Sequence, residues 1–490
     1  MARQTRREFL ENSLLATTAA LMAGSTSILP AQAEEQSDSP SERLRVAVLG
    51  VNGRGGSHVG AFTSRKDTEV AVICDPDTVV GQRMCDEVEK RTGKRPSYVA
   101  DLRHVFNDRS VDLVSIATPN HWHSLAAIWA IQAGKDVYVE KPVSHNVSEG
   151  RRVVDAARRY GRICQTGTQS RSMTGTRALM EFLHNGGIGT ISLARGLCYK
   201  SRPSIGPRGT YDVPASVDYD LWSGPAPVNP LTRMRFHYDW HWQWDYGNGD
   251  LGNQGIHQMD LARWGLGVSD LGQGVLSYGG RLGYEDAGDS ANTQVSIHDY
   301  GDKTLVFEVR GLKTEPYMGA GVGVIFTGSE GYAVMSSYSG GVVFDPNGNV
   351  VREFKGGDDS LHYANFVKAV RSRRVDDLNA DIEQGHLSSA LCHLGNISYR
   401  LGEKMPVDEV QKRLEGARTK DECLATFGRV KEHLTANNVD LGTARIQFGA
   451  LLGVDGKGET FTGEWRDQAT PYLSREYRMG FEVPSSADKV

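Results

Sequence analysis

The chain has 490 residues, of which 39% are hydrophobic and 23% charged, and its formal net charge is -5 at pH 7. This length allows about two or three domains with substantial cores, and the composition is that of an ordinary soluble globular protein. Nucleic-acid-binding proteins concentrate basic residues on one face. The sequence has no such basic block, so nucleic acid is not expected as a partner.

The first 33 residues differ in character from the rest of the chain. They contain the pair Arg6-Arg7, a mildly apolar stretch and a final "AQA" that ends at Ala33. This pattern predicts an export signal, residues 1–33, that is cleaved after Ala33. The arginine pair followed by x-Phe-Leu resembles a twin-arginine signal, which predicts a periplasmic protein. A membrane anchor or a chance amphipathic tail is the alternative, but a spanning helix needs about 20 strongly apolar residues. No stable membrane span is expected after cleavage.

The six cysteines are scattered and include no C-x-x-C pair: Cys74, Cys85, Cys164, Cys198, Cys392 and Cys423. Cys74 and Cys164 lie in apolar runs, where cysteine behaves as a small hydrophobic residue. A disulfide framework is therefore not expected, although the predicted destination is oxidising.

Residues 34–43 read as a polar linker, and a regular alternation of strands and helices follows over residues 44–165. The predicted strands are 45–50, 69–74, 111–118 and 136–140, and the predicted helices are 54–65, 78–91, 121–133 and 148–160. Continuous apolar strands of this kind are buried on both faces, as in parallel sheets. The alternation predicts an α/β dinucleotide-binding domain of the Rossmann type.

The pattern changes over residues 166–404, where strands follow one another in series. The expected strands are 190–199, 272–284, 291–300, 303–312 and 321–327, and the expected helices are 173–185, 361–371 and 383–401. Strands in series predict a mostly antiparallel open sheet, and so an α+β second domain. Residues 405–490 form a C-terminal extension that we expect to wrap the body or to mediate assembly.

The first strand is followed at once by the glycine-rich turn "GVNGRGG" (50–56). Gly50, Gly53 and Gly55 allow a tight turn and a close approach to a pyrophosphate, and the next helix begins with unpaired N–H groups. Glycine turns are common, but this one has the strand–turn–helix context that phosphate binding requires. We expect Asn52 and Arg54 to line the same cofactor site.

Asp75 ends the second strand, 25 residues after Gly50. An acid at this place accepts hydrogen bonds from the adenosine ribose and repels a 2′-phosphate, so NAD is favoured over NADP. The alternative is a loop aspartate that forms a turn with Pro76. Together with the glycine-rich turn, Asp75 predicts dinucleotide binding.

Two polar motifs, "TPNHWH" (118–123) and "EKP" (140–142), end neighbouring strands of the predicted sheet. Ligands of such folds bind outside the carboxyl ends of the strands, so Glu140 and Lys141 should border the cofactor. A His-x-His pair can bind zinc, but no third ligand lies nearby in sequence, and no metal is expected. A surface lysine that caps a strand is the alternative for Lys141.

A helix is predicted from about Asp250 to Trp264, and it includes "NQGIHQMD" (253–260). Its spacing places Asn253, His257 and Asp260 along one face. Oxidation of an alcohol needs a group that takes the hydroxyl proton, a role suited to a histidine, and a cation such as Lys141 that stabilises the developing alkoxide. A satisfied core histidine is the alternative for His257. Gly252 and Gly255 indicate a close approach to another part of the protein.

Upstream, the run "FHYDWHWQWDYGNGD" (236–250) concentrates Trp240, Trp242 and Trp244. Indole rings are good platforms for the C–H faces of sugars, so these residues are predicted to bind substrate, together with Asp260. A core or interface aromatic cluster is the alternative. Three nearby arginines could pair with a uronate or simply be solvated: Arg202, Arg233 and Arg235.

Taken together, the glycine-rich turn, "TPNHWH", "EKP" and the Gly-x-His helix resemble the glucose–fructose oxidoreductase, inositol dehydrogenase and MocA family over roughly residues 44–400. "DYDLWSGPAP" (218–227) and "HYANFVKAVRSRR" (362–374) are also similar to stretches of exported bacterial members. The resemblance implies a Rossmann domain, then an α/β domain whose open sheet often mediates oligomerisation, here as a homodimer or homotetramer. It also implies a bound nicotinamide cofactor and a sugar, polyol or related substrate.

By the family pattern, Lys141 would contact both the nicotinamide and the substrate hydroxyl, and Thr118, Asn120 and His123 would line the nicotinamide pocket. The sequence departs from the family at one position, because the usual Asp-x-Gly-x-His has Asn253 in place of the acid. An amide can orient a substrate, but it cannot act as a base. Asp260, one turn beyond His257, could orient the histidine instead.

Three hypotheses follow. The first is a periplasmic NAD(P)-dependent dehydrogenase that acts on CH–OH groups of a sugar, polyol or sugar derivative, with Lys141 as electrostatic catalyst, His257 as proton shuttle and Asn253 as substrate-orienting amide. The second is a glycoside hydrolase that uses tightly bound NAD for transient oxidation and elimination, without net redox. The third is a non-catalytic sugar- or cofactor-binding protein, which the missing acid permits but Lys141 and His257 argue against.

Overall fold

The computed structural model describes residues 42–416 and 420–490, and residues 43–490 form one compact unit. The predicted export signal and nearly all of the predicted linker lie outside the described residues. Within the described part, no helix is long and apolar enough to cross a membrane. All six cysteines lie in that part and are buried, and no disulfide joins them there.

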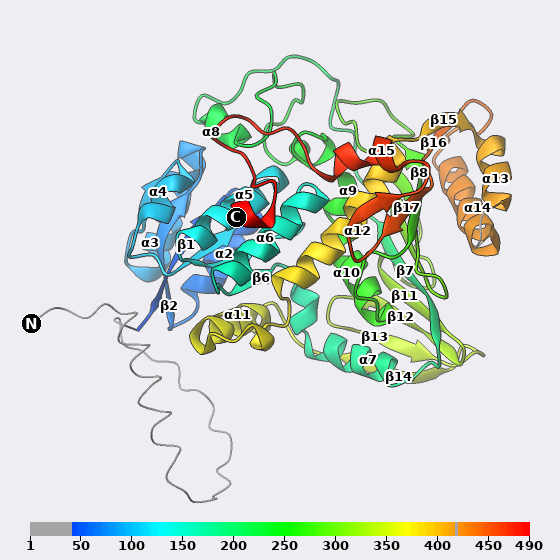
Figure 1. Cartoon of the computed structure of the whole chain (residues 1–490), viewed down its shortest axis with the longest axis horizontal. Coiled ribbons are helices and arrows are strands. Elements are labelled where there is room, and N and C mark those ends of the chain that lie inside the picture. Colours follow the sequence, from blue (N-terminus) through cyan, green and yellow to red (C-terminus); the bar gives the residue numbers. More distant parts are fainter. Residues whose placement is uncertain (1–41, 417–419) are drawn as a thin grey trace, which may run out of the picture. The chain divides into compact units, whose positions relative to one another are not determined.

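The first domain is built on a six-stranded parallel sheet in the order β3-β2-β1-β4-β5-β6 (Figure 1). Its strands are β1 (Leu44–Leu49), β2 (Thr68–Cys74), β3 (Ser97–Val99), β4 (Leu113–Ile116), β5 (Asp136–Val139) and β6 (Cys164–Thr166). Its helices are α2 (Arg54–Thr63), α3 (Thr78–Thr92), α4 (Leu102–Asn107), α5 (Asn120–Gln132) and α6 (Val147–Arg159). The chain order reverses between β1 and β4, which opens a crevice at their carboxyl ends. The predicted Rossmann domain is confirmed.

The second domain is built on a twelve-stranded sheet whose main path is β14-β13-β12-β11-β7-β10-β9-β8-β16-β15, with β17 joined to β8 and to β18. The expectation of a mostly antiparallel sheet is confirmed, since only the β7–β10 pair is parallel within the described residues. The strands are β7 (Ile191–Tyr199), β8 (Gly274–Gly280), β9 (Thr293–Asp299), β10 (Thr304–Arg310), β11 (Val322–Gly328), β12 (Gly331–Ser337), β13 (Gly340–Phe344), β14 (Val350–Lys355), β15 (Glu403–Pro406), β16 (Arg445–Phe448), β17 (Leu452–Asp455) and β18 (Thr460–Thr462).

Helices pack on both faces of this sheet, and further short helices connect its parts. They are α7 (Thr174–His184), α8 (Tyr219–Ser223), α9 (Gly249–Gly252), α10 (Gly255–Leu266), α12 (Ile382–Arg400), α13 (Val407–Glu415), α14 (Lys420–Ala436) and α15 (Arg466–Ala469), whereas α11 (Ser360–Ser372) packs in the core of the first domain. On one face, α10 packs with β10 and α12 in the main core, which includes Met259 and Phe307. On the other, Phe427 of α14 packs with Tyr278 and Val306 of the strands.

The C-terminal extension connects the two domains. Its strands β16–β18 join the second sheet, and its last residues then return to the first domain, where the C-terminus lies near α5 and α6 (Figure 1, red). There Phe481, Val483 and Val490 join the hydrophobic core that includes Trp122 of α5. Residues 405–490 therefore complete the cores of both domains.

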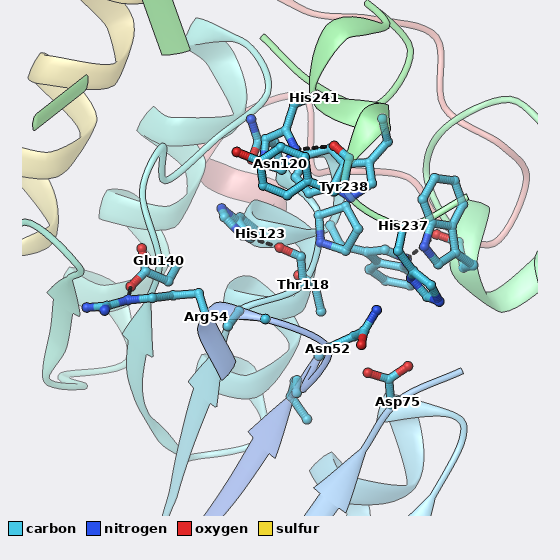
Figure 2. Close-up of a pocket in the computed structure, with 18 of the residues that line it drawn as sticks. Asn52, Arg54, Asp75, Thr118, Asn120, His123, Glu140, His237, Tyr238 and His241 are labelled. Atoms are coloured by element: carbon cyan, nitrogen blue, oxygen red, sulfur yellow. Dashed lines mark hydrogen bonds and ion pairs between the residues drawn. The ribbon is translucent and has the colours of Figure 1, made fainter. Parts of the chain in front are cut away.

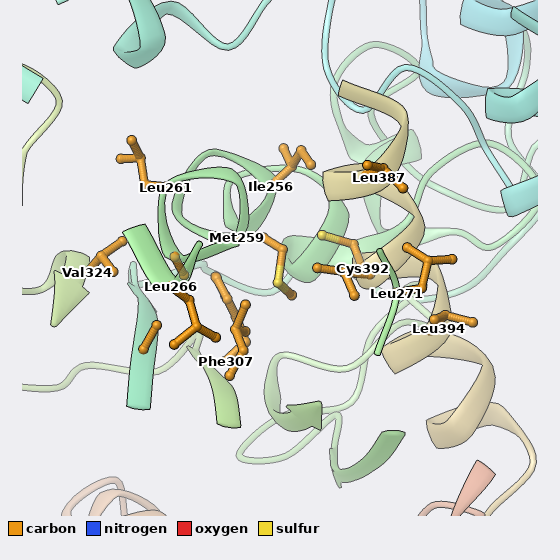
Figure 3. Close-up of a cluster of buried hydrophobic side chains, with 14 of the residues drawn as sticks. Ile256, Met259, Leu261, Leu266, Leu271, Phe307, Val324, Leu387, Cys392 and Leu394 are labelled. Atoms are coloured by element: carbon orange, nitrogen blue, oxygen red, sulfur yellow. The ribbon is translucent and has the colours of Figure 1, made fainter. Parts of the chain in front are cut away.

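The helix predicted from about Asp250 to Trp264 is interrupted, which corrects the sequence-based expectation. It ends at Gly252 as α9 and begins again at Gly255 as α10, with Asn253 at the break (φ -85°, ψ -76°). All residues of α10 except Trp264 are buried, so the helix has no solvent face. It lies between the sheet and α12 (Figure 3). Gly255 is required by the packing, because a Cβ there would lie 3.0 Å from the ring of Phe307.

Asp260 is committed to the core rather than to the site predicted for it. Its carboxylate accepts hydrogen bonds from the Arg171 guanidinium at 2.8–3.0 Å and from the Ser388 hydroxyl at 2.7 Å. Only 1% of Asp260 and 5% of Arg171 is exposed. A buried ion pair is costly to break, because removal of one partner leaves an uncompensated charge in the interior.

We therefore predict that Asp260→Asn lowers the free energy of unfolding by about 3–5 kcal/mol, as expected for a buried ion pair that loses one partner. The measurement is chemical denaturation followed by circular dichroism. Asp302→Asn, a matched change at an exposed aspartate, should alter stability by less than about 0.5 kcal/mol. Equal stability of the two variants would show that the pair does not support the fold.

Candidate active site

One cavity of about 550 Å³ is lined by residues of both domains. Its walls include most of the residues predicted from the sequence: Gly50, Asn52, Gly53, Arg54, Asp75, Thr118, Asn120, His123, Glu140, Lys141, Trp240, Asn253 and His257. Figure 2 labels seven of them, from Asn52 and Arg54 at the glycine-rich turn to Glu140. The cavity therefore brings the predicted phosphate turn and the predicted catalytic residues together in a single space.

The glycine-rich turn has the geometry that a dinucleotide requires. Gly50 adopts φ +76°, and a Cβ there would lie 2.8 Å from the Ala117 carbonyl oxygen. A Cβ at Gly55 would lie 1.8 Å from the Gly50 carbonyl oxygen, whereas a Cβ at Gly53 would have no other part of the protein within 4 Å. Gly53 also caps α2 without a side-chain hydrogen bond. The Gly56 N–H donates to the Gly53 carbonyl oxygen at 2.9 Å, so the N–H groups of Arg54 and Gly55 are the ones that can bind a pyrophosphate, and the residues fit NAD.

Asp75 lies at the carboxyl end of β2, with its carboxylate turned toward the cavity (Figure 2). It accepts hydrogen bonds from the backbone N–H groups of Val51 at 2.8 Å and Asp77 at 3.0 Å. Burial raises the pKa of Asp75 to about 6, although these two hydrogen bonds oppose the shift. An ionised carboxylate at this place can accept hydrogen bonds from a ribose diol.

Glu140 is the buried carboxylate at the end of β5. It accepts hydrogen bonds from Arg54 at 2.9 Å, from the backbone N–H of Lys141 at 3.1 Å and from Gln169 at 3.4 Å, and His58 lies 3.0 Å away. Burial alone would raise the pKa of Glu140, but His58, Arg54 and Lys141 outweigh it and hold the pKa well below its ordinary value. Glu140 thus anchors the α2 residues Arg54 and His58 at the cofactor end of the cavity.

The residues of "TPNHWH" shape the cavity through contacts with backbone and side chains. His123 lies 2.6 Å from the Pro142 carbonyl oxygen and 2.7 Å from the Thr118 carbonyl oxygen, so its ring joins the two strand ends. The Thr118 hydroxyl is buried without a hydrogen-bond partner in the described structure. Asn120 donates to the side chain of Asn248 at 3.0 Å. The orphaned hydroxyl is a group that a bound cofactor can satisfy.

Lys141 reaches from the first domain to the break between α9 and α10. Its Nζ donates a hydrogen bond to the Asn253 carbonyl oxygen at 3.0 Å. In a continuous helix this oxygen would accept from the His257 N–H, which instead donates to the Gln254 carbonyl oxygen at 3.3 Å. Burial lowers the pKa of Lys141, and Glu140 opposes the shift. The interrupted helix therefore provides the acceptor that positions the lysine.

His257 follows in the first turn of α10 and is 9% exposed, toward the cavity that it lines. Its ring lies against that of Tyr338, with centroids 5.1 Å apart. Burial, with a further contribution from Lys141, holds the pKa of His257 well below its ordinary value. The imidazole is therefore neutral near pH 7 and can accept a proton.

The three tryptophans of residues 236–250 have different surroundings. Trp240 lines the cavity and stacks on His241, with ring centroids 3.6 Å apart. Trp242 is buried under the Arg202 guanidinium, and Trp244 lines a separate pocket. Like Asp260, Trp242 and Trp244 do not line this cavity. A short 3-10 helix covers Asp239–Trp242 and ends before Trp244, and the three tryptophans do not gather at one surface of the cavity.

The three arginines considered for a uronate are each engaged by other residues of the chain: Arg202 by Asp250, Arg233 by Gln243 and the Phe236 carbonyl, and Arg235 by Asp239.

No group of three or more His, Cys, Asp or Glu residues in the described chain is placed to hold a metal. His121, of the His-x-His pair, lies 2.9 Å from the Trp222 carbonyl oxygen.

Sequence reasoning missed several residues that line the cavity: Gln169, His237, Tyr238, His241, Tyr338 and Asp359. His237 and His241 lie in the quoted aromatic run, and their proximity to the tryptophans was the available signal. Tyr338 lies between β12 and β13, far from every motif, and nothing local marks it.

The C-terminal extension packs behind the part of the cavity wall that Trp122 and Leu221 form, which we call the roof. Arg478 donates hydrogen bonds to the carbonyl oxygens of Asp220 and Gly224, both at 3.1 Å. Phe481 packs edge-on against Trp122, with centroids 5.6 Å apart, and Trp122 in turn donates to the Leu221 carbonyl oxygen at 3.0 Å. Leu221 and Trp122 both line the cavity. The extension thus lies directly behind the wall formed by these residues.

Comparison with known proteins agrees with this geometry. Residues 44–168 match the model of an oxidoreductase family with an NAD-binding Rossmann fold, GFO_IDH_MocA, and residues 196–287 match the model of that family's C-terminal alpha/beta domain. The first match covers the first domain and supports an NAD-binding Rossmann fold there, and the second covers part of the second domain.

Among curated proteins, the alpha-N-acetylgalactosaminidase of Shewanella oneidensis is 31% identical over 174 residues, which cover 32% of this chain and 38% of that protein. A glycosyl hydrolase family 109 protein of a Shewanella species is 35% identical over 127 residues, 25% of this chain and 28% of that protein. The matched part thus spans well under half the length of these relatives.

Among solved structures, the WlbA dehydrogenase from Bordetella pertussis, in complex with NADH and UDP-GlcNAcA, is similar with a TM-score of 0.55 and 21% identity, over 73% of this chain and 97% of that chain. GenD2 from gentamicin A biosynthesis, in complex with NAD, has a TM-score of 0.53 and 19% identity, over 75% of this chain and 96% of that chain. At these identities the likeness shows a shared fold.

We predict that the affinity for NAD falls by roughly tenfold between pH 7 and pH 5, because Asp75, with a pKa of about 6, is mostly protonated at pH 5 and no longer an anionic acceptor. Calorimetric titration of NAD across this range measures the effect. In Asp75→Asn the affinity should be weaker at pH 7 and nearly independent of pH. An unchanged pH dependence in the variant would rule out Asp75 as its source.

Loss of the hydrogen bonds that Arg478 donates behind the roof should weaken the retention of NAD in the cavity. We predict that Arg478→Ala raises the dissociation rate of bound NAD several-fold, because hydrogen bonds to a charged group contribute about 1.5–3 kcal/mol and these two hold the roof. Stopped-flow displacement of bound NADH measures the rate. Arg466→Ala, in the same extension but exposed, is the control. Equal rates in the two variants would contradict a supporting role for Arg478.

Proposed function

We propose that the protein is an NAD-dependent enzyme that acts on a sugar, a polyol or a sugar derivative by hydride transfer at a CH–OH group. The observation that carries this proposal is the single cavity, in which the glycine-rich turn and Asp75 lie with Lys141 and His257. A cofactor held by the turn and a substrate held at the catalytic residues would therefore meet in one cavity.

The residues suit the chemistry in the following way. Bound NAD supplies the hydride acceptor. His257 is neutral and takes the proton of the substrate hydroxyl, while the Lys141 ammonium stabilises the oxygen as it becomes negative. Asn253 also lines this cavity, where its carboxamide would hold a neighbouring hydroxyl, while its backbone carbonyl fixes Lys141. The carbinol C–H leaves as hydride and the O–H as a proton, so the product is a carbonyl.

A second candidate is favoured by the curated relatives, a galactosaminidase and a glycosyl hydrolase family 109 protein. In this reaction a transient carbonyl acidifies the neighbouring C–H, which loses its proton to a base as the glycosidic leaving group departs. Water then adds at the carbon that lost the leaving group, and the hydride returns to the carbonyl. The net result is hydrolysis, and NAD is neither consumed nor released. An exported protein, as the N-terminal sequence predicts, would benefit from a cofactor that it retains.

The experiment that separates the two candidates is a screen of aldoses, polyols, uronates and aryl glycosides with the purified full chain. NADH absorbance and released aglycone are followed together. Accumulation of NADH supports dehydrogenation, whereas release of aglycone with no net NADH supports the redox-neutral reaction. The absence of both across the panel, with NAD bound, would contradict an enzyme and favour a binding protein.

For whichever substrate is turned over, His257→Ala should lower kcat by about 10²–10⁴-fold, the usual contribution of general acid–base catalysis. Bound NAD should be retained, because His257 is not part of the glycine-rich turn or of the site around Asp75. Since the pKa of His257 is depressed, wild-type kcat should hold steady as pH falls from 8 through 6.5 and decline only at lower pH. His104→Ala, at an exposed histidine, is the control. Full activity of His257→Ala would refute the proposed role.

A further inference from the structure

A second pocket, of about 440 Å³, lies in the C-terminal domain. It is bordered by the loop after β8, the end of α12, strands β15 and β16, and Tyr472 of the extension. Trp244 also lines it, whereas Trp240 and His241 of the same loop line the active-site cavity. Trp244, one of the three tryptophans predicted to bind sugar, therefore lines a pocket that is separate from the active-site cavity. We call this space the basic pocket.

The lining of the basic pocket is strongly cationic in a chain whose net charge is -5. It has four cationic side chains and one carboxylate: Arg281, Arg400, Lys404, Arg445 and Asp289. Arg281 is compensated by Asp286, at 2.5 and 2.6 Å. The other three cations form no ion pair with a carboxylate of the described chain. Charges of one sign gathered in a concave site attract an oxyanion.

Arg400 is held in place before any ligand arrives. Its guanidinium lies between two aromatic rings, 5.2 Å from the Trp244 centroid and 4.8 Å from that of Tyr472. The backbone N–H of Trp244 donates to Asp289 at 2.9 Å, which fixes the indole side of this arrangement. A guanidinium ordered by stacking keeps its donors free and loses little further entropy when it binds a planar or tetrahedral oxyanion.

We propose that the basic pocket binds an acidic saccharide, with a carboxylate or sulfate group held by Arg400, Lys404 and Arg445 and the sugar ring placed beside Trp244. The three cations are exposed to solvent and can form charge-assisted hydrogen bonds with an anion, and the aromatic edge, with Gln447 and Asp289 beside it, suits sugar C–H and hydroxyl groups. A neutral sugar would gain nothing from the three cations. This site does not depend on redox chemistry in the active-site cavity.

Calorimetric titration of the full chain tests the proposal with four probes: glucuronate, galactose 6-sulfate, glucose and inorganic sulfate. Both acidic sugars should bind at least about tenfold more tightly than glucose and than inorganic sulfate, and their affinity should fall as salt rises. Preference for glucuronate or for the sulfated sugar then identifies the anionic group. Equal affinity for glucose and glucuronate, or binding of inorganic sulfate as tight as that of the sugars, would overturn the proposal.

Arg400→Gln and Lys404→Gln should each weaken glucuronate binding by about tenfold or more, as expected when one charge-assisted hydrogen bond is lost. Lys457→Gln removes an exposed lysine outside the pocket and should leave binding unchanged. Thermal unfolding and NAD binding show whether each variant is folded. Wild-type affinity in both folded pocket variants would place any binding elsewhere and refute the basic pocket as the site.

Discussion

The active-site cavity depends on one buried negative charge, that of Glu140. A carboxylate in the interior is costly unless cations and donors surround it, and Arg54, His58 and Gln169 all converge on this one. Arg54 and His58 belong to α2, whose first turn follows the glycine-rich turn, and Glu140 directly precedes Lys141. Compensation of a single charge thus aligns α2, the predicted phosphate-binding helix, with Lys141, the proposed electrostatic catalyst.

The second constraint is the break in the helix that carries His257. It frees the Asn253 carbonyl from the helical ladder, and that oxygen accepts a hydrogen bond from Lys141 across the two domains. The side chain at position 253 is therefore not what positions the lysine. This accounts for how an amide can stand where the family pattern implies an acid while the lysine keeps its place. It also leaves His257 without a neighbouring carboxylate from this position, which agrees with its depressed pKa.

The local patterns of the sequence predicted both sheets and much of the cavity wall. Glycine spacing, strand ends and the acid at Asp75 report on short-range backbone geometry, which a sequence encodes directly. Helical spacing did not predict the surroundings of Asp260. It indicates which face of a helix a side chain lies on, but not whether that part of the face borders a cavity or the protein core. Residue type alone did not place Trp242 and Trp244, because it carries no information on which way each side chain of a loop points. Tyr338 and the supporting Arg478 come from segments brought in by tertiary packing, and no local signal marks them.

The central claim is that a dinucleotide and a sugar react in one cavity through Lys141 and His257. The most direct measurement loads the full chain with NADH carrying deuterium at the transferable position, adds a panel of keto-sugars, and follows deuterium by mass spectrometry. The account predicts deuterium on the new carbinol carbon of at least one sugar, and its loss in His257→Ala. Failure of every keto-sugar to acquire deuterium while NADH stays bound would contradict it.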